Sequence, residues 1–410
     1  MDRLPAELHI AICRDLSSDD MASLALCSHS HNALVRPLLY EHIRVWDRGT
    51  IPRYKDRCLG WKYEHSRLFA LVTTIVSRPS FFGPFVKSIK VVHTEFLSES
   101  DLGQIALCFQ AMTNLRSLWV ISYISGPAFT SFISHVCSGA VSPSLVEFQC
   151  SPTPTAPFLF EFVRSHPNLS VLRLSVDDQN GQNKSQPRFE SISPQARLPH
   201  LTTLELTVGS GGLAFATELL RVSALVERLS ITYSRSLPKL LTDLVLIHLE
   251  SFDGCSRLNH LIIEGTPHHC SQSFSWIISS ILPKIPNLRI LELRQARYKN
   301  HTTSSGNPQQ VIRIDSLLPG QSDVISAFPT KLETLRWLGA DAFFPTVRSD
   351  LSPHGTSNVN ALLELFPSLK VVKYRERGYM FIFRRSEGGV VVRQAVRSTV
   401  PLDMDRFPWS

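Results

Sequence analysis

The stretch Ser165-His166-Pro167-Asn168-Leu169-Ser170-Val171-Leu172-Arg173-Leu174 contains the spacing on which the fold prediction depends. Its three leucines, Leu169, Leu172 and Leu174, follow the order apolar-x-x-apolar-x-apolar. Because side chains alternate along a strand, Leu172 and Leu174 point to one face of a short β-strand. The polar, proline-containing residues before Leu169 are typical of a turn that enters the strand.

The same spacing occurs ten times from residue 86 onward, and successive copies start 29, 30, 24, 32, 25, 32, 30, 44 and 37 residues apart. Amphipathic stretches of helical period, such as Leu102 to Met112, separate several copies. This pattern resembles leucine-rich repeat proteins and predicts a solenoid with parallel strands on its concave face and helices outside. The ten triplets are Val86-Ile89-Val91, Leu115-Leu118-Val120, Leu145-Phe148-Cys150, Leu169-Leu172-Leu174, Leu201-Leu204-Leu206, Val226-Leu229-Ile231, Leu258-Leu261-Ile263, Leu288-Leu291-Leu293, Leu332-Leu335-Trp337 and Leu369-Val372-Tyr374.

The first 45 residues have a different pattern, with apolar residues at helical spacing and polar breaks between them. Leu8, Ile12 and Leu16 are four residues apart, which places them on one helical stripe. The break at residues 17–20, Ser-Ser-Asp-Asp, resembles a capping box that starts a second helix. The pattern therefore predicts three short helices, which bury little surface by themselves and favour a partner.

Three motifs in this segment, in order, resemble an F-box: Leu4-Pro5-x-Glu7-Leu8, Leu16-Ser17-Ser18-Asp19-Asp20 and Leu34-Val35-Arg36-Pro37-Leu38-Leu39-Tyr40. The closing Pro-Leu-Leu-Tyr-Glu-His-Ile is similar to the fungal variety, whereas His31 stands where many members carry an aromatic residue. The resemblance implies binding to a Skp-type adaptor and through it to a cullin. The residues implied to face the adaptor are Leu4, Pro5, Leu8, Ile12, Leu16, Met21, Leu24, Leu34, Val35, Leu38 and Leu39. The alternative is that these helices only cap the following domain.

The predicted organisation is an α/β chain with four segments. They are an F-box at 1–45, a helical linker at 46–84, a leucine-rich repeat domain at 85–375, and a C-terminal hairpin cap and tail at 376–410. The hairpin is predicted because two strand-like runs flank Glu387-Gly388-Gly389. A solenoid needs its last apolar face covered, so we expect this hairpin to cap the repeats.

Two rows of side chains on the repeats are expected to face the concave side. One row contains Trp119, Gln149, Arg173, Glu205, Ser230, Ile262, Glu292, Arg336 and Lys373, and the other contains Ile121, Ser151, Ser175, Thr207, Thr232, Glu264, Arg294, Leu338 and Arg375. Trp119 with Ile121 would form an aromatic–aliphatic anchor. The cations near the end of these rows would bind an acidic or phosphorylated protein segment. The candidate substrate-binding residues are Trp119, Arg294, Arg336, Lys373 and Arg375.

Most of the chain's net charge of +7 lies near its end, because residues 370–397 carry eight cations and two carboxylates. This excess favours an acidic partner or nucleic acid, or forms a solvated capping surface. Few aromatic residues are interleaved with the basic concave positions, which argues against nucleic acid.

No motif predicts catalysis, a cofactor or a metal. Gly209-Ser210-Gly211-Gly212 lacks the lysine of a phosphate-binding loop. His268-His269-Cys270 with Cys255 fits no common zinc spacing. The cysteines form no C-x-x-C pair, and no signal peptide or membrane span is evident. We therefore expect a cytoplasmic or nuclear protein, and the resemblance to F-box proteins with leucine-rich repeats implies a substrate receptor of a Skp–cullin–F-box ubiquitin ligase, not itself an enzyme. The alternative is a repeat scaffold not engaged in ubiquitination.

Overall fold

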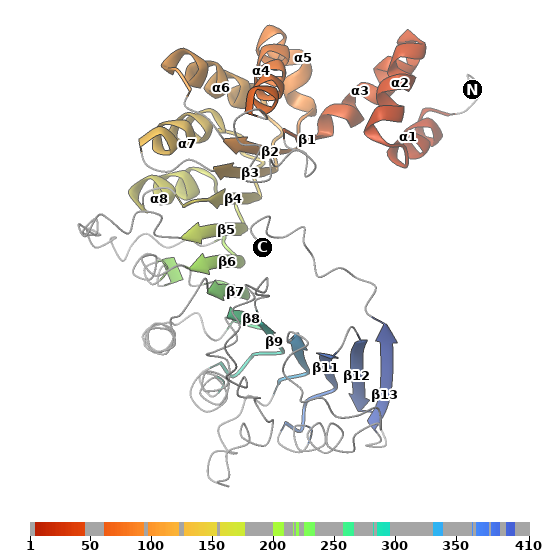
Figure 1. Ribbon diagram of the computed structural model, residues 1–410, viewed down its shortest axis with the longest axis vertical. Helices are drawn as coiled ribbons and strands as arrows, with labels where there is room; N and C mark the ends of the chain where they lie inside the picture. The colour runs from red at the N-terminus through yellow and green to blue at the C-terminus, as the bar shows by residue number, and fades with distance from the viewer. Residues whose placement is uncertain are drawn as a thin grey trace, which may run out of the picture. The chain divides into compact units, whose positions relative to one another are not determined.

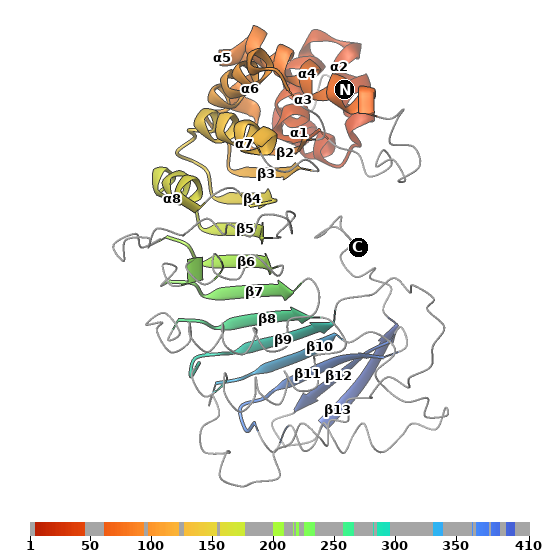
Figure 2. The same cartoon turned by 60° about the vertical axis from the view of Figure 1, so that its left-hand side comes forward.

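The chain forms two compact units, Met1–Ser175 and Val176–Ser410, in the computed structural model. Figures 1 and 2 show the helices and strands of both units. Each unit is considered by itself below. The structure describes residues 5–45, 61–93, 97–122, 127–153, 156–176, 200–208, 225–233, 257–265, 285–295, 331–338, 366–376, 379–385 and 391–397, with the single positions 216, 219, 220, 282 and 363.

Three helices begin the first unit, as the sequence predicted. Ser17 caps the second helix, because its hydroxyl oxygen accepts a hydrogen bond from the backbone N–H of Asp20 at 3.1 Å. Ser28 caps the third helix through the N–H of His31, also at 3.1 Å. These helices are α1 (Ala6–Arg14), α2 (Ser18–Cys27) and α3 (His29–Glu41).

The sheet of the first unit is parallel, with its strands in sequence order. Its first strand lies inside the segment predicted as F-box, because α3 leads directly into it at His42. Ile43 of this strand pairs in register with Ile89. The sheet therefore already begins within residues 1–45, before the boundary that the sequence predicted. The strands are β1 (His42–Arg44), β2 (Ser88–His93), β3 (Ser117–Ser122), β4 (Glu147–Ser151) and β5 (Val171–Val176).

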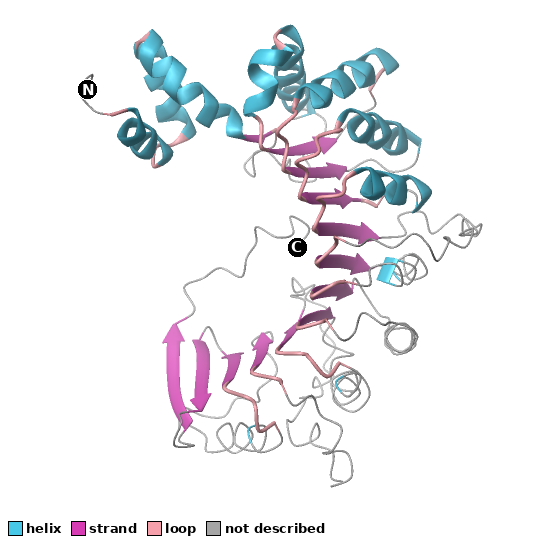
Figure 3. Ribbon diagram, turned by 180° about the vertical axis from the view of Figure 1, so that it is seen from behind, coloured by secondary structure: helices cyan, strands magenta, loops and turns pink. Residues whose placement is uncertain are grey.

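Helices line one side of these strands, drawn cyan against magenta in Figure 3. They are α4 (Trp61–Ser77), α5 (Pro79–Phe82), the 3-10 helix η2 (Gly83–Phe85), α6 (Glu99–Ala111), α7 (Pro127–Gly139) and α8 (Ala156–Ser165). Helices α4, α5 and η2 lie in the segment predicted as a helical linker, whose residues 46–60 lie outside the described part. No single described helix has the length and apolar character to cross a bilayer; only the bent pair Leu68–Ser77 and Pro79–Phe85 meets both measures together.

The second unit continues the pattern of one parallel strand per repeat and ends in an antiparallel hairpin. Its strands are β6 (Thr203–Val208), β7 (Arg228–Tyr233), β8 (His260–Gly265), β9 (Ile290–Gln295), β10 (Thr334–Leu338), β11 (Val371–Glu376), β12 (Tyr379–Arg385) and β13 (Val391–Arg397). Strands β12 and β13 pair antiparallel, which confirms the predicted hairpin. Amphipathic stretches of helical period also occur at residues 213–225, 274–282 and 359–366, and these fall largely outside the described residues.

The apolar triplets form the core of each unit. Leu118, Phe148 and Leu172 are neighbours in register on three successive strands, and each is fully buried. Asn114 and Asn168 at two strand entrances tie their repeats to the preceding one, since their side-chain amides donate to the carbonyls of Pro84 at 2.8 Å and Pro143 at 2.7 Å. Each repeat is therefore stabilised mainly by its neighbours.

Two glycines mark places where the packing of the first unit leaves no room for a side chain. A Cβ added to Gly139, the last residue of α7, would lie 2.3 Å from the carbonyl oxygen of Ala106 in α6. A Cβ added to Gly83 would lie 2.1 Å from the carbonyl oxygen of Ala111. By contrast, a Cβ on Gly103 of α6 would meet no atom within 4 Å.

We expect Gly139→Ala to lower the free energy of unfolding by about 1–3 kcal/mol, because the backbone of α6 must move away from the new methyl group. The matched change Gly103→Ala should raise it by up to about 1 kcal/mol, since alanine favours a helix over glycine. Urea denaturation of both variants measures the difference. Equal effects of the two changes would contradict this close helix packing.

Candidate functional site

The strand registers align the predicted concave positions into rows within each unit. In the first unit Lys90, Trp119, Gln149 and Arg173 are neighbours on successive strands. In the second unit the row contains Glu205, Ser230, Ile262, Glu292, Arg336 and Lys373. Residues directly opposite each other on paired strands share a face of the sheet. Each row therefore forms one strip along the sheet, but Gln149, Glu205, Ile262 and Glu292 are buried instead of open to solvent.

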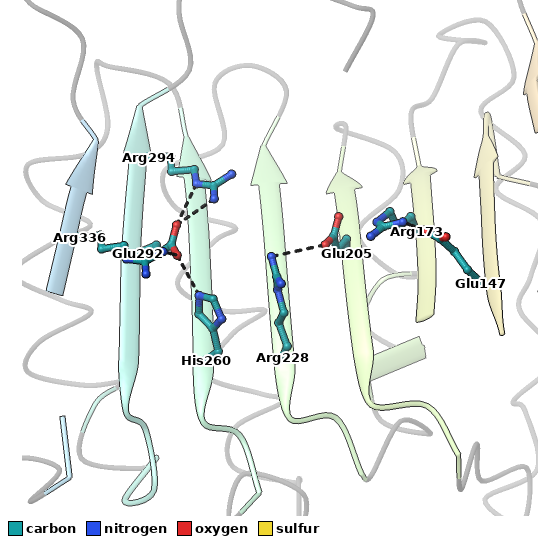
Figure 4. A network of polar contacts seen from close by, with 8 residues as sticks. All are labelled: Glu147, Arg173, Glu205, Arg228, His260, Glu292, Arg294 and Arg336. Atoms are coloured by element: carbon teal, nitrogen blue, oxygen red, sulfur yellow. Dashed lines mark hydrogen bonds and ion pairs between the residues drawn. The ribbon is translucent and has the colours of Figure 1, made fainter. Parts of the chain in front are cut away.

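Glu292 on β9 is the centre of the polar network in the second unit (Figure 4). Its carboxylate is 2% exposed and accepts hydrogen bonds from two arginines. The Arg294 Nη2 lies 2.8 Å from Oε2, and the Arg336 Nη1 lies 2.7 Å from Oε1. The Nε2 atom of His260 on β8 lies 3.1 Å from Oε1. Three neighbouring strands thus converge on one carboxylate.

The surroundings of Glu292 keep it ionised despite its burial. Burial by itself raises the pKa of this carboxyl, but hydrogen bonds from His260 and Arg294 and the charges of Arg294 and Arg336 lower it more. The resulting pKa is about 2, compared with an ordinary value of 4.5. Glu292 is therefore a fixed negative charge that orients the guanidinium groups around it.

The cations around Glu292 outnumber the carboxylates. Burial and the neighbouring charges of Arg336 and Arg384 lower the pKa of Lys373, and Glu292 only partly opposes them. Burial also raises the pKa of Glu264, which lies beside Arg294 in register, while the charge of Arg294 opposes that rise. Arg336 and Arg294 keep 36% and 23% of their side chains exposed. These two guanidinium groups have already lost most of their contact with water, so binding an anion would remove little more water from them.

We expect Glu292→Gln to lower the free energy of unfolding by about 3 kcal/mol at neutral pH, the value linked to its depressed pKa. Because the pKa of Glu292 is depressed in the folded protein, this carboxylate stabilises the fold above pH 4.5, and the stabilisation is lost as the pH falls toward 2. The free energies of unfolding of wild type and Glu292→Gln should therefore converge over that range. The control Glu333→Gln removes exposed ion pairs with Arg289 and Lys370 and should cost less than about 1 kcal/mol. Parallel wild-type and variant curves between pH 2 and 4.5 would contradict this assignment.

The aromatic–aliphatic anchor predicted in the first unit is only partly present. Trp119 is half-buried, with the Lys90 ammonium 4.6 Å from its ring centroid and the Arg173 guanidinium at 5.9 Å. Arg173 also forms an ion pair with Glu147. Ile121, by contrast, is fully buried and offers no exposed surface to a partner. The exposed part of this row is therefore a tryptophan flanked by cations.

The remaining candidate substrate residue, Arg375, lies on β11, two residues after Lys373 and on the same face. Its side chain lies outside the described residues. The second unit also contains an ion pair that sequence reasoning did not single out, between Arg228 Nη2 and Glu205 Oε1 at 3.8 Å (Figure 4). Glu205 on β6 and Arg228 on β7 carry opposite charges on paired strands. This opposite charge is the signal by which the sequence could have revealed the ion pair.

Two stretches of sequence that fit neither a phosphate-binding loop nor a zinc site lie outside the described residues. They are residues 209–212 and residues 268–270 with Cys255. Within the described ranges, no group of three or more His, Cys, Asp or Glu residues could hold a metal ion. The described cysteines are unpaired thiols, and burial raises the pKa of Cys108 to about 12. Such a thiol is a poor nucleophile at neutral pH.

The residues predicted to face an adaptor are distributed unequally over α1–α3. Leu8 and Ile12 on α1 are exposed, at 51% and 48%. Pro5 is exposed before α1, and Leu4 lies outside the described residues. The half-buried members of the set are Leu16, Met21, Leu24, Leu34, Leu38 and Leu39.

Val35 needs a correction, because it is fully buried within the chain and is a core residue rather than a contact residue. Sequence reasoning also missed Leu26, which is 87% exposed near the end of α2. Leu26 lies off the apolar stripe that predicted Met21 and Leu24, so periodicity gave no reason to select it. The outer surface of α1 and α2 thus presents Leu8, Ile12 and Leu26 to solvent.

The sequence matches no protein-family model and no curated protein. Among solved structures, the chain is similar to the leucine-rich repeat-containing protein LegL7 from Legionella pneumophila. The two are 12% identical with a TM-score of 0.39, over 74% of this chain and 92% of that one. A likeness this low carries no weight for function. The recurring strands and buried leucine triplets of the chain itself identify a leucine-rich-repeat-like scaffold.

Proposed function

We propose that the chain is a substrate receptor that binds a Skp-type adaptor through α1–α3 and a protein substrate through its repeats. In this role the chain brings a substrate close to a conjugating enzyme in a cullin-based ubiquitin ligase, in the cytoplasm or nucleus. Its contribution is proximity, and bond chemistry belongs to other subunits.

The exposed apolar surface of α1 and α2 is the observation that carries the adaptor proposal. Helix α2 buries none of its ten residues within the described chain. Its apolar residues Met21 and Leu24 are only half-buried, so α2 keeps apolar surface for a partner to cover. Leu8, Ile12 and Leu26 together would supply apolar contacts to a partner's helices.

Two hydrogen bonds hold the end of α3 against the residue that precedes β2. Glu41 at the end of α3 accepts a hydrogen bond from the Lys87 ammonium at 2.8 Å. The Lys87 backbone N–H donates to the Glu41 carbonyl at 2.9 Å. The lowered pKa of Glu41, caused first by its bond to Lys87, keeps this pair charged. A partner on α1–α3 would therefore be held close to the first strands.

The adaptor proposal predicts that Leu8→Asp/Leu26→Asp abolishes capture of a purified Skp-type adaptor while the protein stays folded. Charged groups at these exposed sites leave the core intact but oppose apolar contact. The matched control Val141→Asp changes another exposed apolar residue, 60% exposed in the first unit, and should bind as wild type. Pull-down with purified adaptor measures capture.

No capture by the folded wild type would reject the adaptor role and leave a repeat scaffold outside ubiquitination. Capture of the adaptor without a cullin would also place the chain outside a ligase.

The cation cluster around Glu292 supports the substrate half of the proposal. Arg294, Arg336 and Lys373 face one buried carboxylate and leave a positive excess on the described strands β9 to β11. Arginine pairs with carboxylates and phosphates through two parallel hydrogen bonds. We propose that an acidic or phosphorylated segment of the substrate binds here.

Arg336→Glu is therefore expected to weaken binding of an acidic or phosphorylated peptide at least about tenfold, since a close charge pair becomes a repulsion. Arg289→Glu is the matched control, because Arg289 is 59% exposed and paired with Glu333 at the strand entrance. Fluorescence anisotropy at fixed salt measures both affinities. Unchanged affinity of the Arg336 variant would reject the cluster as the site.

Strong, sequence-independent binding of DNA that falls steeply with salt would instead indicate that the basic residues bind nucleic acid.

A further inference from the structure

Strand β13 ends the sheet of the second unit and pairs with β12 along one edge (Figures 1 and 2). No described strand lies along its other edge. An edge strand of seven residues offers a row of backbone N–H and C=O groups to another chain. Such an edge either has a device that prevents pairing or selects a particular partner.

The hydrogen bonds of the hairpin show which backbone groups of β13 face outward. The Arg385 N–H donates to the Lys370 carbonyl at 3.0 Å, so odd-numbered residues of β12 bond to β11. Even-numbered residues of β12, such as Ile382, then bond to β13, where Ile382 is opposite Gln394. The β13 residues whose backbone groups point outward are therefore Val391, Arg393, Ala395 and Arg397.

The charge of this edge has one sign. Strand β13 carries Arg393 and Arg397, and its neighbour β12 carries Arg384 and Arg385. Neither strand contains an aspartate or a glutamate. Arg385 is held by the carbonyl of Pro367 at 2.7 Å, which leaves its positive charge uncompensated by a carboxylate there. A strand that pairs with β13 would lie in a positive field.

We propose that the outer edge of β13 binds an extended acidic segment of another protein, which adds one strand to the sheet. Outward backbone groups at alternate residues provide the hydrogen bonds common to strand addition, and the net positive charge of β12 and β13 favours a partner that carries carboxylates. A second copy of this chain fits the edge poorly, because it would bring the same arginines to the same pairing. This site is separate from the Glu292 cluster and does not depend on adaptor binding.

Residue-resolved amide hydrogen exchange of the full chain tests the proposal with a short synthetic peptide that alternates glutamate and valine. Strand addition should slow exchange at Arg393, Ala395 and Arg397 by about an order of magnitude or more. Exchange at Val392, Gln394 and Val396 should change little, because these amides already bond to β12. Slowing of both sets equally, or of neither, would overturn the proposal.

Peptide variants separate backbone pairing from simple charge attraction while the protein remains wild type. The same peptide methylated on one alternate set of amide nitrogens should lose binding, and the peptide methylated on the other set should keep it. A peptide with lysine in place of glutamate should bind at least about tenfold more weakly. Equal binding of the two methylated peptides, or of the lysine peptide, would overturn strand addition by an acidic segment.

Protein variants locate the peptide. Ala395→Pro removes an outward N–H and leaves the pairing to β12 intact, so it should weaken binding, whereas Ala395→Ser should not. In Arg336→Glu the slowing of amide exchange at Arg393, Ala395 and Arg397 by the peptide should remain, because that readout reports the β13 edge and not the Glu292 cluster. Loss of binding in the Arg336 variant with retention in Ala395→Pro would move the peptide to the Glu292 cluster and overturn the proposal. Sedimentation that shows β13-dependent dimers without peptide would assign the edge to a second copy instead.

Discussion

Burial of one apolar triplet per repeat against the triplets of its neighbours is the constraint on which the rest of the structure depends. Leu118, Phe148 and Leu172 illustrate it, since each is fully buried and each lies opposite the next in register. A shift of one residue would turn a strand's leucines to solvent, so the apolar column fixes the register. The fixed register then aligns the polar residues of neighbouring strands, and Glu292 meets cations from β9 and β10 for this reason.

Sequence periodicity predicted the strands, the three N-terminal helices and the C-terminal hairpin, because each depends on local spacing. It missed β1, whose three residues His42–Arg44 are too short to show a period and directly follow a helix. It placed Ile121 outward, although alternation alone cannot tell how deeply a strand end is covered. The Glu292 network could be predicted only as a row, since its hydrogen bonds depend on side-chain conformations across strands.

The two ends of the chain present different chemistry to partners. The first helices offer apolar side chains, among them Leu8 and Leu26, and the last strands offer cations around a single buried carboxylate. An apolar surface suits a lasting contact with a fixed partner, whereas a charged surface suits selection among segments by charge. This division is what a receptor that joins an adaptor to a substrate requires. The exposed apolar helices are its most decisive feature, because a plain repeat cap would bury them.

Hydrogen exchange of the full chain with and without a purified Skp-type adaptor tests the central claim most directly. The account predicts that protection rises in α1–α3, residues 6–41, and stays unchanged in the strands β2–β5 of the same unit. Protection spread over the repeats, or no change in α1–α3 at saturating adaptor, would contradict it. In that case the helices would serve as a cap, and the chain would be a repeat scaffold with another partner.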